Sequence, residues 1–301
     1  MRPVLLLALL SALACATPRA DGPAPPARLQ LATARAKLAR LSSHRAQLWV
    51  VVHVRAHKTL RADGTVDEPR LIETAVRNAR AVVEGGGDMV ILINSRCEMP
   101  LYERVLAAVR AAFPQFPLGI SALSYGPQNL TEGFRLAEGF HADLVWTEVV
   151  PGQGFEWEDD DGSYKPGAVT PVELALGTQA RVRPAALHVS GVHMKYTRPT
   201  DGRSFDTALR DALGTVDGIN ITGAATGVLA DVERVRRARE LAGAWPMGLA
   251  SGVSTENIAS VLPYIDYAIV GTSLKEPGDP LLTSAERVRA LRAAMNARDA
   301  Q

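Results

Sequence analysis

The sequence predicts a parallel (β/α)8 barrel, and three observations lead to this fold class. The chain has 301 residues, of which 47% are hydrophobic, so it is long enough to bury one sizeable core. From Leu48 onward, short apolar runs alternate with longer segments of helical periodicity. Eight such pairs occur, and this alternation favours a parallel sheet whose strands are buried on both faces.

The predicted strands are short and rich in aliphatic and β-branched residues. They are Leu48–Val54, Met89–Ile93, Leu118–Leu123, Leu144–Val149, Ala186–Val192, Gly218–Thr222, Met247–Ala250 and Ala268–Val270. The predicted helices between and after them are Glu68–Glu84, Leu101–Phe113, Gln128–Gly139, Pro171–Val182, Phe205–Leu213, Asp231–Ala242, Thr255–Leu262 and Ser284–Asn296. Pro100 and Pro171 fall at helix starts, where proline is tolerated.

A doubly wound open sheet is the alternative arrangement of these elements. No glycine-rich dinucleotide fingerprint follows the first strand, and the paired glycine turns come late in the chain, which favours the barrel. We therefore expect residues 28–301 to form a single barrel domain. Helical periodicity over Arg28–Arg45 predicts an additional helix that closes the bottom of the barrel.

The first residues are typical of a targeting segment. Arg2 precedes an apolar run, Val4–Leu13, that is too short to span a bilayer. Cys15 follows Ala-Leu-Ala, as the lipidated cysteine follows a bacterial lipoprotein signal. We expect a signal peptide over residues 1–15, a Pro/Ala-rich tether over 16–27, and export to the periplasm or a membrane anchor at Cys15. A misassigned start codon would instead leave the protein in the cytoplasm.

Composition excludes some classes of partner. The formal net charge is only +1, so no basic field indicates nucleic acid binding. Two cysteines cannot form a disulfide framework, and Cys97 is expected to be a packed thiol. No motif calls for a cofactor. His53 and His57 would need a helix to share a face, and Glu156–Asp161 lacks EF-hand spacing, so no metal site is predicted.

Two late turns predict an anion-binding site. Pro246–Ser254 and Tyr267–Ser273 each contain an apolar run that ends in glycine with serine or threonine. In barrels of this kind, the loops after strands seven and eight often bind phosphate through backbone N–H groups. Two ordinary turns that need glycine for their geometry are the alternative. The predicted phosphate-binding residues are Ser251, Gly252, Val253, Gly271, Thr272 and Ser273.

Polar residues at the carboxyl ends of the other strands are candidates for catalysis. Lys195 and His193 are two residues apart and are expected on one face of the fifth strand. A lysine there can pair with a phosphate or carboxylate, or form a Schiff base once it has lost its proton. Glu148 is a candidate general base or an ion-pair partner for Lys195. Predicted substrate contacts are His53, Asn94, Asn220 and Thr222, although His53 also fits a core histidine.

One long insertion follows the fourth strand. Pro151–Pro166 combines five acidic residues with aromatic side chains and turn formers, and it falls on the face where barrels have their active sites. It is interpreted as a lid, with a solvated loop as the alternative. His188 is expected to be structural, and Asp217 and Asp266 are expected to cap strands or form ion pairs at the opposite face.

Four motifs resemble those of the BtpA/SgcQ family: Ser190–Lys195, Ile219–Gly227, Ala250–Ile258 and Ile269–Lys275. The resemblance runs from about Leu48 to Arg292 and implies a TIM barrel of the ribulose-phosphate-binding type. One branch of that family is associated with photosystem I biogenesis and another with sugar metabolism.

The chain departs from the family pattern in three places. His53 is followed by Val-Arg-Ala-His-Lys rather than by a Pro-rich turn. Gly191 stands where relatives tend to carry an acidic residue. The family is generally cytosolic, whereas this chain carries the targeting segment.

The leading hypothesis is a barrel that binds a small phosphorylated or anionic metabolite, as an isomerase, lyase or hydrolase. The alternative is a non-catalytic, membrane-associated assembly factor. A homo-oligomer is compatible with either.

Overall fold

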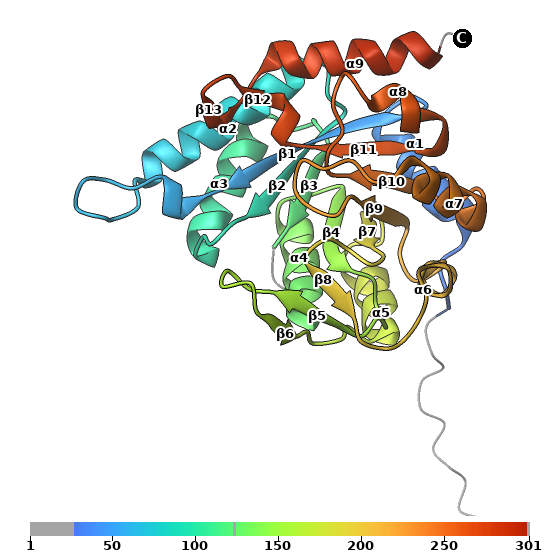
Figure 1. Cartoon of the computed structure of the whole chain (residues 1–301). Helices are drawn as coiled ribbons and strands as arrows, with labels where there is room; N and C mark the ends of the chain where they lie inside the picture. Colours follow the sequence, from blue (N-terminus) through green and yellow to red (C-terminus); the bar gives the residue numbers. More distant parts are fainter. Residues whose placement is uncertain (1–26, 123–124, 300–301) are drawn as a thin grey trace, which may run out of the picture.

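The computed structural model describes residues 27–122 and 125–299 and forms a closed barrel of eight parallel strands ringed by helices (Figure 1). The strands follow one another around the barrel in chain order, and the last pairs with the first. They are β1 (Gln47–Val54), β2 (Met89–Asn94), β3 (Leu118–Ser121), β4 (Leu144–Val149), β7 (Leu187–Gly191), β9 (Gly218–Thr222), β10 (Met247–Ala250) and β11 (Tyr267–Val270). The predicted fold class is confirmed, and the open sheet is excluded by closure between β1 and β11.

The predicted helices are present, with bounds that differ by a few residues. They are α1 (Leu31–Leu41), α2 (Glu68–Glu84), α3 (Met99–Ala112), α4 (Pro127–Gly139), α5 (Val172–Val182), α6 (Phe205–Ala212), α7 (Val232–Ala242), α8 (Ile258–Val261) and α9 (Ala285–Asp299). Short 3₁₀ segments are η1 (Ala56–Lys58), η2 (Leu262–Tyr264) and η3 (Thr272–Leu274). Helix α1 is shorter than expected at both ends, and α8 begins three residues late because the Asn257 side chain accepts from the Ser254 amide and holds that stretch as a turn.

The inside of the barrel is a packed core rather than a channel. Trp49 and Tyr267 stack with ring centroids 3.9 Å apart, and both are fully buried. Gly248 leaves room for this pair, since a Cβ there would lie 2.0 Å from the Tyr267 ring. These two rings therefore fill the interior of the barrel at their level.

Helix α1 closes the bottom of the barrel, as predicted. Lys37 Nζ lies 3.0 Å from the buried carboxylate of Asp217, and it also donates to the carbonyl of Ala186. Arg35 forms an ion pair with Asp266 at 2.5 Å. Both aspartates also accept from backbone amides at strand starts, so they are caps and ion pairs together.

Four aspartates at this end repeat one arrangement. One aspartate directly precedes each of β2, β4, β9 and β11, which are every second strand of the barrel. Its carboxylate accepts from a backbone amide near the start of the barrel strand that comes just before it in the chain. The four carboxylates and their amide donors are Asp88 with Leu48, Asp143 with Leu118, Asp217 with His188, and Asp266 with Met247. The repeat fixes the stagger of neighbouring strands at four positions around the ring.

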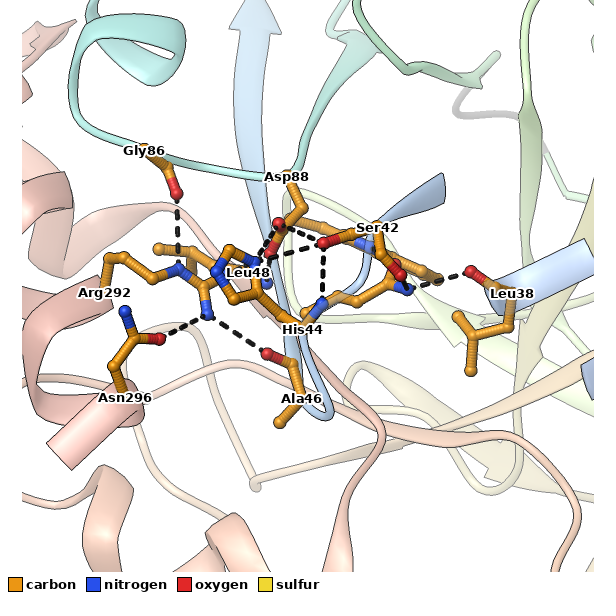
Figure 2. A network of polar contacts seen from close by, with 11 residues as sticks. Leu38, Ser42, His44, Ala46, Leu48, Gly86, Asp88, Arg292 and Asn296 are labelled. Carbon is orange, nitrogen blue, oxygen red and sulfur yellow. Dashed lines mark hydrogen bonds and ion pairs between the residues drawn. The ribbon is translucent and has the colours of Figure 1, made fainter. Parts of the chain in front are cut away.

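The network around Asp88 joins the two ends of the barrel sequence (Figure 2). Its carboxylate forms an ion pair with Arg292 of α9 and accepts from Ser42 at 2.7 Å. His44 Nδ1 lies 2.7 Å from the same carboxylate. Arg292 also donates to the backbone carbonyls of Ala46 and Gly86. The final helix is thereby bound to the segment that leads into β1.

The insertion after β4 is more ordered than a solvated loop. It forms β5 (Phe155–Glu158) and β6 (Tyr164–Pro166), which join β8 (Thr197–Pro199) in a separate antiparallel sheet. The acidic run makes the turn of this hairpin: Asp159 pairs with Lys165, and Asp161 accepts from the Ser163 amide. A second small hairpin, β12 (Lys275–Glu276) with β13 (Asp279–Thr283), precedes α9.

The predicted signal segment, the tether and Cys15 lie outside the described residues. Within the described ranges, no helix has the length and apolar character to cross a membrane. The same ranges contain no cluster of three or more His, Cys, Asp or Glu side chains that could hold a metal ion. Cys97 is a buried free thiol, as expected, and burial raises its pKa to about 11.

Candidate functional site

A cavity of about 520 Å³ opens at the carboxyl end of the barrel. Every barrel strand, or the loop that follows it, contributes to its wall. Ten of the residues predicted from the sequence line it: His53, Glu148, Lys195, Thr222, Ser251, Gly252, Val253, Gly271, Thr272 and Ser273. This is the face of a (β/α)8 barrel on which active sites are built.

The two late turns form one side of the cavity. Ser273 Oγ donates to the carbonyl of Val253 at 2.6 Å, and Asn257 donates to the carbonyl of Gly252 at 2.7 Å. The first bond joins the two turns, the second lies within the turn after β10, and both engage carbonyl groups of that turn. The amide N–H groups of Gly252, Val253, Gly271 and Thr272 have no acceptor among the described residues. This side of the cavity therefore presents unpaired donors.

The two glycines of these turns have different roles. Gly252 has φ +68, and a Cβ there would lie 2.0 Å from the backbone nitrogen of Leu229, so the fold itself requires glycine. At Gly271 the nearest atom to such a Cβ is a Val51 carbon at 3.5 Å. Close approach of an anion is therefore a separate reason for glycine only at Gly271.

Lys195 reaches across the cavity toward the turn after β10. Its amide donates to Thr222 Oγ1 at 3.0 Å, which fixes the base of the side chain. Its Nζ donates to Ser251 Oγ at 2.7 Å and to Thr226 Oγ1 at 3.3 Å. Burial lowers the pKa of this amine, against the opposing effect of Glu148.

Glu148 is the carboxyl group of the cavity wall. It extends from β4 with no hydrogen bond or ion pair to another described residue. Burial raises its pKa to about 7, and the nearby charge of Lys195 only partly offsets that effect. The group is therefore suited to give or accept a proton near neutral pH.

His53 contributes a neutral ring. Burial lowers its pKa to about 3, with smaller contributions from Arg55 and Lys275. Its Nδ1 has no partner among the described residues. Lys275, beside it, has its pKa lowered by burial to about 8 and donates to Thr283. His53 therefore places an uncharged ring at the cavity wall.

Three predicted site residues do not line the cavity. The expectation that His193 shares a strand face with Lys195 is wrong, because β7 ends at Gly191 and His193 turns with φ +47 to pack edge-on against Phe205. Asn94 folds back onto the backbone of Cys97. Asn220 is fully buried one layer below Thr222 and accepts from the Tyr267 hydroxyl at 2.9 Å.

Other cavity residues were not predicted. Trp146 precedes Glu148 by two residues on β4, so strand alternation could have identified it. Its Nε1 is buried without a partner in the described structure. Tyr196 and Thr226 also line the wall, and the Tyr196 hydroxyl accepts from the Thr226 amide at 3.0 Å. Thr226 lies within a motif already noted, whereas no local pattern indicates Tyr196.

The antiparallel sheet approaches the cavity through one aromatic contact. Tyr125, which lines the cavity, stacks on Trp157 of β5 with centroids 5.5 Å apart. It also meets Phe155 at 5.5 Å. This sheet therefore borders the cavity.

Comparison with known proteins identifies the sequence family. The sequence pattern of the BtpA family matches residues 45–297. Photosystem I biogenesis protein BtpA of Synechocystis sp. is 31% identical over 233 residues, which cover 71% of this chain and 78% of that protein. An uncharacterised protein of Pyrococcus abyssi is 28% identical over 230 residues, which cover 72% and 83%.

Solved structures show the same fold at low identity. Thiamine phosphate pyrophosphorylase from Pyrococcus furiosus has a TM-score of 0.52 and 13% identity, covering 84% of this chain and 96% of that one. Phosphoribosyl anthranilate isomerase from Thermus thermophilus has a TM-score of 0.50 and 14% identity, covering 84% and 99%. Both are barrels of the ribulose-phosphate-binding type, and at this identity they support the architecture alone. With its family pattern matched over almost the whole barrel, the chain belongs to the BtpA family.

Proposed function

We propose that this protein binds a small phosphorylated or otherwise anionic metabolite in the cavity at the carboxyl end of the barrel. The unpaired amides of Gly252, Val253, Gly271 and Thr272 would hold the anion. This arrangement carries the proposal, because several N–H groups without acceptors at one cavity wall favour an anionic ligand. Lys195 adds a positive charge beside Ser251, on the same side of the cavity.

Glu148 and Lys195 would act on the part of the ligand that lies next to the anion. Their pKa values are shifted toward neutrality, which suits proton transfer at physiological pH. His53 and Trp146 also line the cavity and would contact the ligand there. Isomerisation, carbon–carbon bond cleavage and hydrolysis all use such groups, so the proposal names this set of reactions. His193 is replaced by His53 as the histidine of the site.

Thr272 offers a test of the anion site that leaves the packing intact. Its side chain is exposed at the cavity wall. Thr272→Asp places a negative charge beside the amides, whereas Thr272→Asn is a neutral control of the same shape. Thermal unfolding would be followed with inorganic phosphate, sugar phosphates and nucleotides. A ligand at a hundred times its dissociation constant stabilises the native state by about 2.7 kcal/mol.

We expect at least one of these phosphates to raise the melting temperature of the wild type and of Thr272→Asn, but not of Thr272→Asp. Equal shifts in all three proteins would place the anion elsewhere. No shift with any phosphate would reject the proposal.

A non-catalytic assembly factor remains the second candidate, because the Synechocystis relative is named as a photosystem I biogenesis protein. Lys195→Ala separates the two. A catalyst would lose turnover with this change, whereas an assembly factor would retain its effect on complex formation.

A further inference from the structure

Lys195 is the lysine that lines the cavity among the residues the structure describes. Its backbone is anchored by Thr222, and its Nζ is held between the hydroxyls of Ser251 and Thr226. No carboxylate lies within 4.0 Å of this amine in the described part of the chain. The hydrogen-bond partners of this amine are therefore two neutral hydroxyls rather than a carboxylate.

The surroundings of the amine disfavour its charged form. The floor of the cavity below it is apolar, with Val51, Met194 and Ile269 among its residues. Burial lowers the pKa of Lys195 and so favours its neutral amine. The neutral amine is the form that attacks a carbonyl carbon. Position and environment therefore suit the nitrogen for covalent chemistry.

A proton carrier is present in the same cavity. Glu148 lines the wall and has no hydrogen-bond partner among the described residues. Glu148 and Lys195 line the same cavity, and no contact ion pair joins them in the described structure. The space between them is where a reacting group of a ligand would fit.

We propose that Lys195 forms a Schiff base with the carbonyl group of a phosphorylated aldehyde or ketone. This deepens the proposed function and rests on it, because the turns after β10 and β11 would hold the phosphate. The Ser251 contact keeps the amine next to those turns, so the carbonyl would lie only a few bonds from the phosphate.

The step balances without an oxidant or reductant. The Lys195 ammonium gives a proton to Glu148, and the neutral nitrogen attacks the carbonyl carbon to form a C–N bond. Glu148 returns a proton to the carbonyl oxygen, and the resulting hydroxyl leaves as water with a further proton from nitrogen passed through Glu148. The net change is ammonium plus carbonyl to iminium plus water, and the iminium then withdraws electrons from the neighbouring carbon.

Borohydride trapping tests this proposal on the full-length protein. The protein is mixed with dihydroxyacetone phosphate, glyceraldehyde 3-phosphate or pyridoxal 5′-phosphate, and with unphosphorylated dihydroxyacetone, and each mixture is reduced with sodium borohydride. A reduced Schiff base adds the mass of the carbonyl compound less one oxygen atom. Peptide mapping identifies the modified lysine. Lys195→Arg keeps the charge but cannot be trapped, and Lys58→Arg removes an exposed lysine as a matched control.

We expect the adduct on Lys195 in the wild type and in Lys58→Arg, with complete loss in Lys195→Arg. We also expect a higher yield with the phosphorylated compounds than with dihydroxyacetone. Absence of an adduct on Lys195, or equal labelling of Lys58, would overturn the proposal. Phosphate-induced stabilisation is measured in the same samples. Its persistence without an adduct would leave the anion site intact and reject only the Schiff base.

Discussion

Glu148 shows how strongly the chemistry of one side chain depends on its place in the fold. It is the next-to-last residue of β4, a strand with no other charged side chain, and burial raises its pKa to about 7. The unfolded chain releases this proton near pH 4.5, its ordinary value. Between these two pH values the folded protein holds a proton that the unfolded chain has lost, so the free energy of unfolding falls as the pH rises.

Glu148→Gln removes this pH dependence. As the pH rises from roughly 4 to 8, we expect the free energy of unfolding of the wild type to fall relative to that of the variant by a total of about 1–3 kcal/mol. This range follows from the conversion of pKa shifts to free energy. Urea denaturation of both proteins across that range measures the difference. A stability difference that stays constant with pH would show that Glu148 ionises at its ordinary value.

Backbone conformations around the cavity add to this residue-scale picture. His193, Tyr196 and Ser251 are non-glycine residues with φ of 47°, 59° and 101°. Such conformations cost energy and concentrate at functional sites, where neighbouring contacts maintain them. Here the Tyr196 hydroxyl is bonded to Thr226 and the Ser251 hydroxyl to Lys195.

At the scale of elements, α1 is bound to the barrel by a buried ion pair. Lys37 and Asp217 are both buried, and Asp217 also accepts from Gln179 and from the amide of His188. Replacing one partner of a buried pair leaves the other charge unpaired in a medium of low polarity. Helix α1, although it lies outside the eight strand–helix repeats, therefore contributes to the stability of the barrel.

Lys37→Met tests this role of α1. We expect a loss of roughly 3 kcal/mol in the free energy of unfolding, since breaking a buried pair is costly. Arg40→Met on the same helix is the control, because Arg40 is exposed and donates to the carbonyl of Ala185, and it should cost less than about 1 kcal/mol. Chemical denaturation compares the variants. Equal losses would mean that α1 is held by its apolar face alone.

The insertion after β4 is an element that its own sequence predicted only in part. The aromatic residues of Pro151–Pro166 indicated packing, and Phe155 is indeed buried. Strand β8, however, comes from the loop after β7, about forty residues further along the chain. Pairing over that separation is decided by where the barrel brings the two loops.

At the scale of the whole molecule, each of the four aspartates below the barrel joins one pair of consecutive strands, so the same arrangement occurs four times around the ring. Two of them differ sharply in environment. Asp88 is buried and paired with Arg292, which is itself buried. Asp143 is more exposed, and Arg110 lies 3.8 Å away. The Asp88 network also joins α9 to the segment before β1, so it closes the barrel sequence on itself (Figure 2).

Asp88→Asn and Asp143→Asn compare these two positions. Asparagine can still accept from the strand amide but cannot pair with the arginine. We expect Asp88→Asn to cost roughly 3 kcal/mol and Asp143→Asn less than about 1 kcal/mol. Urea denaturation at fixed pH gives both values. A similar cost at the two sites would mean that the amide bonds, rather than the ion pairs, dominate.

The sequence by itself determined the order and type of the barrel elements, the closing helix, the family and the two late turns. These depend on local periodicity, glycine and capping residues, which act over a few positions along the chain. It could also place Glu148, Thr222 and Lys195 near the cavity, because strand ends of a parallel barrel meet at one face.

Only the tertiary structure decided which of these side chains meet. His193 turns away because β7 ends two residues before it, and Asn220 lies one layer too deep. Trp146 and Tyr196 enter the cavity, and Gly252 is required by the chain at Leu229 rather than by a ligand. Side-chain direction, depth and desolvation follow from packing between segments far apart in sequence, and no local pattern encodes them.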